Sequence, residues 1–259
     1  MDLGIKGRKA VVCASSQGLG LACATALARE GCSVFINGRN TERLANARAQ
    51  IEQETGVRVH TVAADISTEA GRQALFDACP DADILVNNNA GPQPGKLADW
   101  DHAAWIAALE SNMLAPILLI RAFIPGMRAR KFGRIVNITS AMVKSPRPHM
   151  ALSTTARTGL TAFSKSLSLE AAVDNVTINN LLPERIDTPR QQFMAERWMK
   201  QYNIDMAEAR RRITETVAAK RFGTPREFSD ACAFLCSDQA GFISGQNLQL
   251  DGGSYHGLI

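Results

Sequence analysis

The sequence predicts an α/β protein built on a doubly wound parallel sheet with helices on both faces. Short runs rich in β-branched residues alternate with amphipathic stretches along the 259-residue chain. A glycine-rich turn separates the first run from the first amphipathic stretch. No repeat or low-complexity linker interrupts this alternation, so we expect one domain over residues 1–259.

Seven short runs are rich in β-branched and other apolar residues, which is typical of strands buried in a parallel sheet. In chain order the predicted strands are 9–14, 33–37, 57–62, 84–88 and 134–139, followed by the weaker 177–182 and 247–250. Amphipathic spacing between them predicts helices at 18–30, 41–54, 68–79, 101–128, 151–172 and 226–236. Residues favoured at helix N-termini, Thr41 and Thr68, begin two of these.

Composition excludes several classes of function. Hydrophobic residues make up 46% of the chain, which is ample for a core and excludes disorder as the main state. A net charge of +4 is too small to indicate a nucleic-acid or membrane partner. The longest uninterrupted apolar run, 113–120, contains Pro116, so no membrane span is expected. The first ten residues lack the apolar segment of a secretory signal, which predicts a cytoplasmic protein.

Six scattered cysteines suit reduced thiols better than a disulfide framework. Cys232 and Cys236, four residues apart, would share a helix face, the spacing of two metal ligands. No further His or Cys near them completes a site, so we expect a packed pair and no metal.

One irregular region, 183–221, lies between the last two predicted strands. It carries Met194, Trp198, Met199, Tyr202 and Met206 at roughly helical spacing. One interpretation is a helix pair packed on the surface. The other is a mobile lid over a substrate, favoured by its position beyond the carboxyl end of a strand.

The first predicted strand runs into a glycine-rich turn of the kind that binds a dinucleotide. Backbone N–H groups in such a turn approach a pyrophosphate, and the following helix adds partial positive charge, although the same glycines permit tight strand–helix packing without a ligand. The predicted cofactor residues of this turn are Ala14, Ser15, Ser16, Gly18, Leu19 and Gly20. The pattern makes the fold Rossmann-type.

Residues after the second and third predicted strands point to NADP. An acidic residue after the second strand would bind the ribose 2′-hydroxyl of NAD, whereas Arg39 suits the 2′-phosphate of NADP. The alternative for Arg39 is a solvated surface arginine. Asp65 and Ile66 end the third strand, where the adenine edge would lie.

These and later motifs resemble the short-chain dehydrogenase/reductase family over essentially the whole chain. The matching features are Gly18-Leu19-Gly20, Asp65, Asn88-Asn89-Ala90-Gly91, Asn112, Ser140, Asn179, Pro183 with Thr188, Phe222-Gly223-Thr224-Pro225, Ser244-Gly245-Gln246 and Asp251-Gly252-Gly253. The resemblance implies that Asn89, Ala90 and Pro183 also contact the cofactor. It further implies a small-molecule substrate and a homo-oligomer, a tetramer or dimer built on the long helices.

The catalytic residues depart from the family pattern. Family members pair a proton-transferring Tyr with a Lys four residues later, assisted by a Ser and an Asn. Here Ser140 and Asn112 match, but Ser153 and Arg157 stand at the places of the Tyr and Lys. This arrangement is similar to a 3-oxoacyl-carrier-protein-reductase-like subgroup that lacks the usual pair. Serine is a weaker acid and a shorter side chain than tyrosine, and Arg157 keeps its charge, so it could bind ribose but not relay protons.

Three residues are candidates to replace the missing proton donor, each with the alternative of a solvated or structural role. His149 lies four residues before Ser153 and titrates near neutral pH. Lys144 lies four residues after Ser140. Glu184 follows Pro183, where burial would raise its pKa.

Three functions remain open at this stage. The first is an NADP(H)-dependent oxidoreductase acting on a carbonyl or alcohol through Ser140, Asn112, Ser153 and Arg157. The second is a non-redox lyase, isomerase or dehalogenase-like enzyme on the same fold, suggested by Arg157. The third is a non-catalytic NADP-binding protein, suggested by the missing Tyr and Lys.

Overall fold

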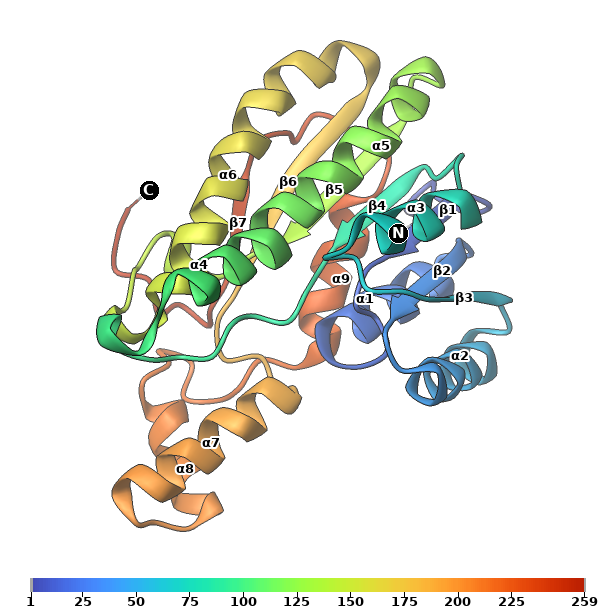
Figure 1. The fold of residues 1–259 in the computed structure, drawn as a ribbon. Helices are drawn as coiled ribbons and strands as arrows, with labels where there is room; N and C mark the ends of the chain where they lie inside the picture. Colours follow the sequence, from blue (N-terminus) through green and yellow to red (C-terminus); the bar gives the residue numbers. More distant parts are fainter. Residues whose placement is uncertain (1, 259) are drawn as a thin grey trace.

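The computed structural model, which describes residues 2–258, contains a seven-stranded sheet in which every neighbouring pair is parallel (Figure 1). Its strands are β1 (Lys9–Val12), β2 (Ser33–Gly38), β3 (Val59–Ala63), β4 (Ile84–Asn87), β5 (Gly133–Ile138), β6 (Val176–Pro183) and β7 (Asn247–Leu250). Their order is β3-β2-β1-β4-β5-β6-β7, so the chain reverses direction across the sheet between β1 and β4. The predicted doubly wound α/β fold is therefore confirmed.

The helices are α1 (Gly18–Arg29), α2 (Thr41–Thr55), α3 (Glu69–Ala78), α4 (His102–Leu109), α5 (Ala115–Ala129), α6 (Ala151–Ala171), α7 (Pro189–Tyr202), α8 (Met206–Glu215) and α9 (Pro225–Leu235). Two predicted helix starts are close to those observed. Asn40 caps α2 by accepting from the Arg43 N–H at 2.8 Å, and Thr68 caps α3 by accepting from the Gly71 N–H at 3.0 Å.

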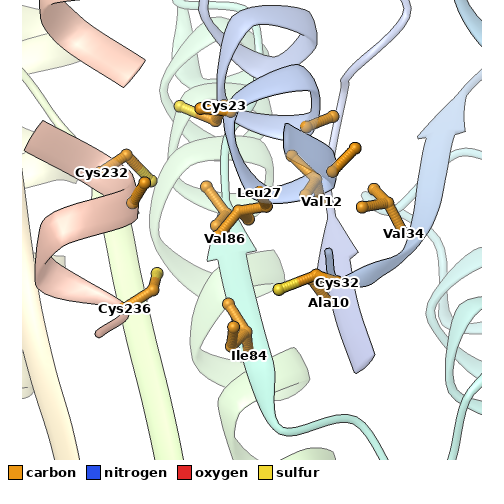
Figure 2. Packing of buried hydrophobic residues seen from close by; sticks show 14 of the residues in the cluster. Ala10, Val12, Cys23, Leu27, Cys32, Val34, Ile84, Val86, Cys232 and Cys236 are labelled. Atoms are coloured by element: carbon orange, nitrogen blue, oxygen red, sulfur yellow. The ribbon is translucent and has the colours of Figure 1, made fainter. Parts of the chain in front are cut away.

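Two hydrophobic cores cover the two faces of the sheet. Side chains of α1, α2 and α9 form the first core with the strands, and side chains of α3, α5 and α6 form the second. Figure 2 shows part of the first core, where Cys23 and Cys232 lie near Leu27 and Val86. Both faces of the central strands are consequently buried, which explains why β4 and β5 are rich in Ile, Leu and Val.

All six cysteines are buried and free. Burial raises the pKa of Cys13 to about 12, and hydrogen bonding to Cys232 together with burial raises the pKa of Cys236 well above its usual range. Within residues 2–258, no group of three or more His, Cys, Asp or Glu could hold a metal ion. Cys232 and Cys236 belong to the packed core (Figure 2).

The helix predicted at 101–128 is interrupted. α4 and α5 are joined by a π-helical segment, Glu110–Leu114, in which the Ala115 N–H donates to the carbonyl of Glu110 five residues earlier. Pro116 has no N–H to donate to the carbonyl of Asn112, so the regular pattern cannot continue through this point. The widened turn carries Asn112.

The helical run His102–Ala129 is long and apolar enough, by length and composition, to cross a membrane. This differs from the sequence-based expectation, which considered only uninterrupted apolar runs. Leu119, Phe123 and Met127 on this run are buried in the second core. A helix that covers a sheet and a helix that spans a membrane both place apolar side chains away from water. Length and apolar composition therefore do not distinguish between them.

The irregular region 183–221 contains α7 and α8, which project from the body as a helical pair (Figure 1). The pair has a small core of its own, centred on Ala195, Ala209 and Ile213. Trp198, Met199 and Met206 pack against this core. The aromatic and methionine side chains predicted to close over a substrate thus hold α7 and α8 together.

Candidate active site

The glycine turn after β1 is shaped by close backbone packing. Ala14 adopts a left-handed conformation with φ of 43°, as does Gly18 with φ of 60°. A Cβ on Gly20 would lie 2.4 Å from the carbonyl oxygen of Ala14, so only glycine fits there. Gln17 makes no side-chain hydrogen bond at the N-terminus of α1, which leaves the first-turn N–H groups free of a side-chain cap.

Ser15 belongs to the structure of the turn itself. Its hydroxyl donates to the Val12 carbonyl at 2.7 Å and accepts from the Asn37 N–H at 2.9 Å, and its own N–H donates to the Asn37 carbonyl. Ser15 therefore has no donor left for a phosphate. Ser16 remains half-buried beside Gly38.

Arg39 and Asp65 lie together at the carboxyl ends of β2 and β3. An Nη1 atom of Arg39 is 3.7 Å from Asp65 Oδ2, and the Arg39 side chain is 76% exposed. Hydrogen bonds from Ser67 and the charge of Arg39 lower the pKa of Asp65. A surface-exposed pair at this distance holds Arg39 loosely and leaves its guanidinium able to bind an anion.

The loop after β4 connects the glycine turn to the π-helical segment. Asn88 donates through Nδ2 to the Ala14 carbonyl at 3.1 Å, and Asn89 donates through Nδ2 to the Ser111 carbonyl at 3.0 Å. Ala90 N–H donates in turn to Asn89 Oδ1. These contacts tie together three segments that the sequence separates widely.

Arg157 on α6 lies where three elements meet. It donates to the Ile138 carbonyl at the end of β5 at 2.6 Å, to the Asn89 carbonyl at 3.3 Å and to Ser153 Oγ at 3.2 Å. Burial, followed by the charge of Arg190, lowers the pKa of Arg157 to about 10, so it stays protonated at neutral pH. A Cβ on Gly91 would lie 3.6 Å from the Arg157 guanidinium.

Ser140 and Asn112 flank this arginine in different ways. Ser140 is half-buried directly after β5, and its Oγ accepts from the Met142 N–H at 3.3 Å. Asn112 is buried, donates to Ser111 Oγ at 2.8 Å and leaves its Oδ1 atom with no hydrogen-bond partner. Asn112, Asn89, Ile66 and Arg157 line a cavity of about 10 Å³, room for about one water molecule.

The comparisons with known proteins agree with this geometry. A family model described as "Enoyl-(Acyl carrier protein) reductase" matches residues 13–255, which is nearly the whole chain. The chain belongs to the short-chain dehydrogenase/reductase family.

Relatives of known name are similar over their full length. An NADPH-dependent reductase, BacG of Bacillus subtilis, is 31% identical over 95% of this chain and 97% of its own. The uncharacterized oxidoreductase YvaG of the same organism is 31% identical over 98% of both chains. A crystal structure of L-sorbose reductase from Gluconobacter frateurii, complexed with NADPH and L-sorbose, has a TM-score of 0.95 at 32% identity and covers 100% of both chains.

One of the three candidate replacement residues, His149, is placed differently from the prediction. His149 was expected one helical turn before Ser153, but α6 begins at Ala151 and His149 lies in the preceding 3₁₀ turn, exposed to solvent. Partial burial and the charges of three nearby arginines lower its pKa, so it is neutral at pH 7.

Glu184 was expected to lie in a buried position, and its side chain is 11% exposed. Its carboxylate forms an ion pair with Arg147 and lies 4.0 Å from Nε of Arg185. Pro183 ends β6, opposite Leu250 of β7.

Lys144 contacts Tyr255, a residue far from it in the sequence, and this contact was not predicted. Its Nζ atom lies 5.2 Å from the ring centre of Tyr255, near the C-terminus. The other tyrosine, Tyr202, contacts Trp198 edge-on within the α7–α8 pair.

Two features near the site were missed by sequence reasoning. One is an asparagine ladder, Asn87, Asn137, Asn180 and Asn247, in which one side chain from each of β4 to β7 bonds to the next at 2.8–3.1 Å. The sequence signal that could have revealed this ladder is the asparagine that occurs in each of the four predicted strands. The other is the contact of α7 with the loop after β4, where Arg190 and Arg197 donate to the carbonyls of Pro92 and Pro94.

Proposed function

We propose that this protein is an NADP(H)-dependent oxidoreductase that acts on a carbonyl or alcohol substrate through an atypical site of Ser140, Asn112, Ser153 and Arg157. The observation that carries the proposal is the buried cation of Arg157. It is fixed by the Ile138 and Asn89 carbonyls at the carboxyl ends of β5 and β4. Ligands of doubly wound sheets bind at this edge.

The residues present fit a nicotinamide dinucleotide. The glycine turn, with Ala14 and Gly18 in left-handed conformations, and the α1 N-terminus without a side-chain cap suit a pyrophosphate. Arg39 suits a 2′-phosphate, and NADPH is named for both BacG and the L-sorbose reductase structure. The residues proposed to hold the cofactor are Ala14, Ser16, Gly18, Leu19, Gly20, Arg39, Asp65, Ile66, Asn89, Ala90, Arg157 and Pro183, without Ser15.

The bound nicotinamide would supply or accept the hydride, and the chain would bind and polarise the substrate oxygen. Ser140 is half-buried at the end of β5, and we assign its hydroxyl the role of donating to that oxygen. Ser153 Oγ accepts from Arg157, which leaves the Ser153 proton available for donation. The fixed charge of Arg157 stabilises negative charge that develops on the substrate oxygen.

The experiment combines cofactor binding with a test of the proton donor. NADPH titration, followed by fluorescence, is expected to show binding that is tighter than that of NADH. A panel of ketones and alcohols is then expected to show slow turnover, because general acid–base catalysis by a matched group contributes about 10²- to 10⁴-fold. The double variant Ser153→Tyr with Arg157→Lys restores the usual pair and is expected to raise carbonyl reduction by at least about 10²-fold.

The single variant Arg157→Lys is the matched control, since it changes the cation without supplying a phenol. Failure to bind NADPH would refute the proposal. Tight NADPH binding with no turnover by the natural protein, and strong turnover by the double variant, would favour a non-catalytic NADP-binding protein instead. Ser153 and Arg157 in place of the family's Tyr and Lys favour that second candidate, because neither supplies the family's proton relay.

We propose that the chain forms one domain and that residues 183–221 act as a lid, because α7 reaches over the loop after β4 through Arg190 and Arg197. We also propose a cytoplasmic homo-oligomer, dimer or tetramer. Six free thiols support a reducing compartment.

A further inference from the structure

Five arginines surround the candidate active site, and we call them the arginine cluster: Arg147, Arg157, Arg185, Arg190 and Arg197. Arg157 lies on α6, and Arg147 lies in the segment before it. Arg185 follows β6, and Arg190 and Arg197 lie on α7. They therefore come from two stretches of the chain, 147–157 and 185–197, and meet at the carboxyl edge of the sheet.

Three members of the cluster are anchored by neutral oxygens. Arg157 donates to two carbonyls and a hydroxyl, while Arg190 and Arg197 donate to the carbonyls of Pro92 and Pro94 at 3.2 and 3.3 Å. A guanidinium has five N–H donors, so these contacts hold each side chain while leaving donors unused. The side chain of Arg185 is 9% exposed, and its buried Nε atom has no hydrogen-bond partner.

The arginines are close enough to repel one another. Burial and then the charge of Arg190 lower the pKa of Arg157, and burial and then the charge of Arg197 lower the pKa of Arg190. The His149 carbonyl accepts from the Gly95 N–H at 3.0 Å, next to the Pro94 that Arg197 contacts. Burial and then the charges of Arg147, Arg197 and Arg185 lower the pKa of His149. The cluster is thus continuous from Arg157 to the segment before α6.

Carboxylates of the chain neutralise little of this charge. Glu184 pairs with Arg147 and lies 4.0 Å from Arg185 Nε. Asp187 instead pairs with Arg210 of α8 at 2.8 Å, and Glu196 accepts from Gln192 on an exposed helix face. Arg157 and Arg185 are buried, and the other three arginines are half-buried. Desolvated charges are costly without an opposite charge, so these cations indicate that a ligand supplies the anion.

We propose that the substrate is an anionic carbonyl compound, whose carboxylate binds Arg197 and its neighbours in the arginine cluster while its carbonyl oxygen lies at Ser140 and Arg157. The proposal rests on the proposed oxidoreductase function. In the reduction, a hydride is added to the carbonyl carbon and a proton to its oxygen, NADPH becomes NADP⁺, and the carboxylate is unchanged. Planar guanidinium groups bind carboxylates through two parallel hydrogen bonds, which is why an arginine cluster favours a carboxylate.

The cofactor's phosphates are a second source of the same anionic oxygens. Arg190 follows Pro189, whose Cδ atom would lie 3.9 Å from a Cβ on Gly18 in the glycine turn. Arg190 is therefore the member of the cluster nearest to a bound pyrophosphate, whereas Arg197 lies two helical turns further along α7. Variants of the two arginines separate the two sources.

The test compares oxo acids with their methyl esters: pyruvate, acetoacetate and levulinate, each against its ester, with NADPH. We expect at least one acid to exceed its ester in kcat/KM by about 10-fold or more. Arg197→Gln should lower that ratio by about 10- to 100-fold, mainly through KM, while the ester's kcat/KM changes little. Arg212→Gln, on the exposed side of α8, is the control and should leave the ratio unchanged.

Two outcomes would overturn the proposal. One is equal kcat/KM for every acid and its ester. The other is an acid-to-ester ratio of kcat/KM that neither Arg197→Gln nor Arg190→Gln changes, together with weaker NADPH binding by Arg190→Gln. That result would show that the arginine cluster binds the phosphates of the cofactor. If no carbonyl is reduced, calorimetry with NADPH-loaded protein decides: acetoacetate binding that Arg197→Gln abolishes supports the anion site even though the oxidoreductase function fails. Absence of such binding refutes it.

Discussion

At Gly20, close packing and helix propensity act in opposite directions. Alanine in place of glycine inside a helix normally stabilises it by about 1 kcal/mol. At Gly20, however, the added Cβ would lie 2.4 Å from the Ala14 carbonyl oxygen and 2.9 Å from Asn88 Nδ2. These atoms belong to the turn and to the loop after β4, neither of which can move freely. The steric term therefore exceeds the propensity term.

We predict that Gly20→Ala lowers the free energy of unfolding by about 2 kcal/mol and weakens NADPH binding strongly. Urea denaturation and fluorescence titration measure the two effects. Gly56→Ala is the control: its φ is 70° with open space around the Cβ, so strain costs about 1 kcal/mol and NADPH binding is unchanged. A Gly20→Ala protein as stable as the natural one would contradict the steric argument.

Near the glycine turn, backbone conformation could be predicted from the sequence, but side-chain contacts could not. The order of glycines predicted the turn correctly because backbone conformation depends on local residue type. The role of Ser15 could not be predicted, since its hydroxyl bonds to Val12 and Asn37, and the second of these lies on another strand. The surroundings of His149 and Glu184 could not be predicted for a similar reason, because they are set by Arg147, Arg185 and Arg197 from segments that are far apart in sequence.

Among the elements, strands were predictable and the breaks in helices were not. All seven strands occur where apolar runs predicted them, within about two residues, because burial on both faces leaves a strong signal. The π-helical segment at Glu110–Leu114 carries little hydrophobic signal of its own. Its cause, the missing N–H of Pro116, is visible in the sequence, but a proline early in a helix is usually tolerated.

The asparagine ladder links four strands through their side chains. Asn137 is its central member: its Oδ1 accepts from Asn87, and its Nδ2 donates to Asn180 and to Ser164. All four of these side chains are buried. Amide hydrogen bonds in a dry interior strengthen one another, and a missing member leaves buried groups without partners.

We predict that Asn137→Leu lowers the free energy of unfolding by about 3 kcal/mol, because Asn87, Asn180 and Ser164 each lose a partner. Asn247→Leu at the end of the ladder is the matched control. It deprives only Asn180 Nδ2 and lies at a half-buried position, so its cost should be about 1 kcal/mol. Equal costs for the two variants, measured by urea denaturation, would show that the ladder does not act as a unit.

Within residues 2–258, the whole molecule has three hydrophobic cores, one on each face of the sheet and one between α7 and α8. The cores on the two faces of the sheet fix the strand ends that carry Arg39 and the glycine turn, and they fix α6, which carries Arg157. The third core holds α7 and α8 to each other, and α7 reaches the body through Arg190 and Arg197. A helical pair with an independent core can move as a unit, which is the property a lid requires.

The helices covering the second core leave apolar surface uncovered. In the most apolar window of His102–Ala129 only 33% of residues are buried within one chain. On the neighbouring helix α6, Leu169 is 74% exposed, and Val173, four residues later in the 3₁₀ turn that follows α6, is 80% exposed. Exposed apolar patches of this kind are typical of contacts between protein chains.

We predict that Leu169→Glu with Val173→Glu shifts the protein to a smaller assembly, because charges in an apolar contact between copies would be desolvated without partners. Light scattering coupled to size-exclusion chromatography measures the mass, and circular dichroism confirms that the helices remain folded. Leu97→Glu is the control: Leu97 is 75% exposed but lies in the loop after β4, so the mass should not change. If the natural chain already elutes as a monomer, or if the double variant keeps the natural mass, this face of α6 does not join copies of the chain.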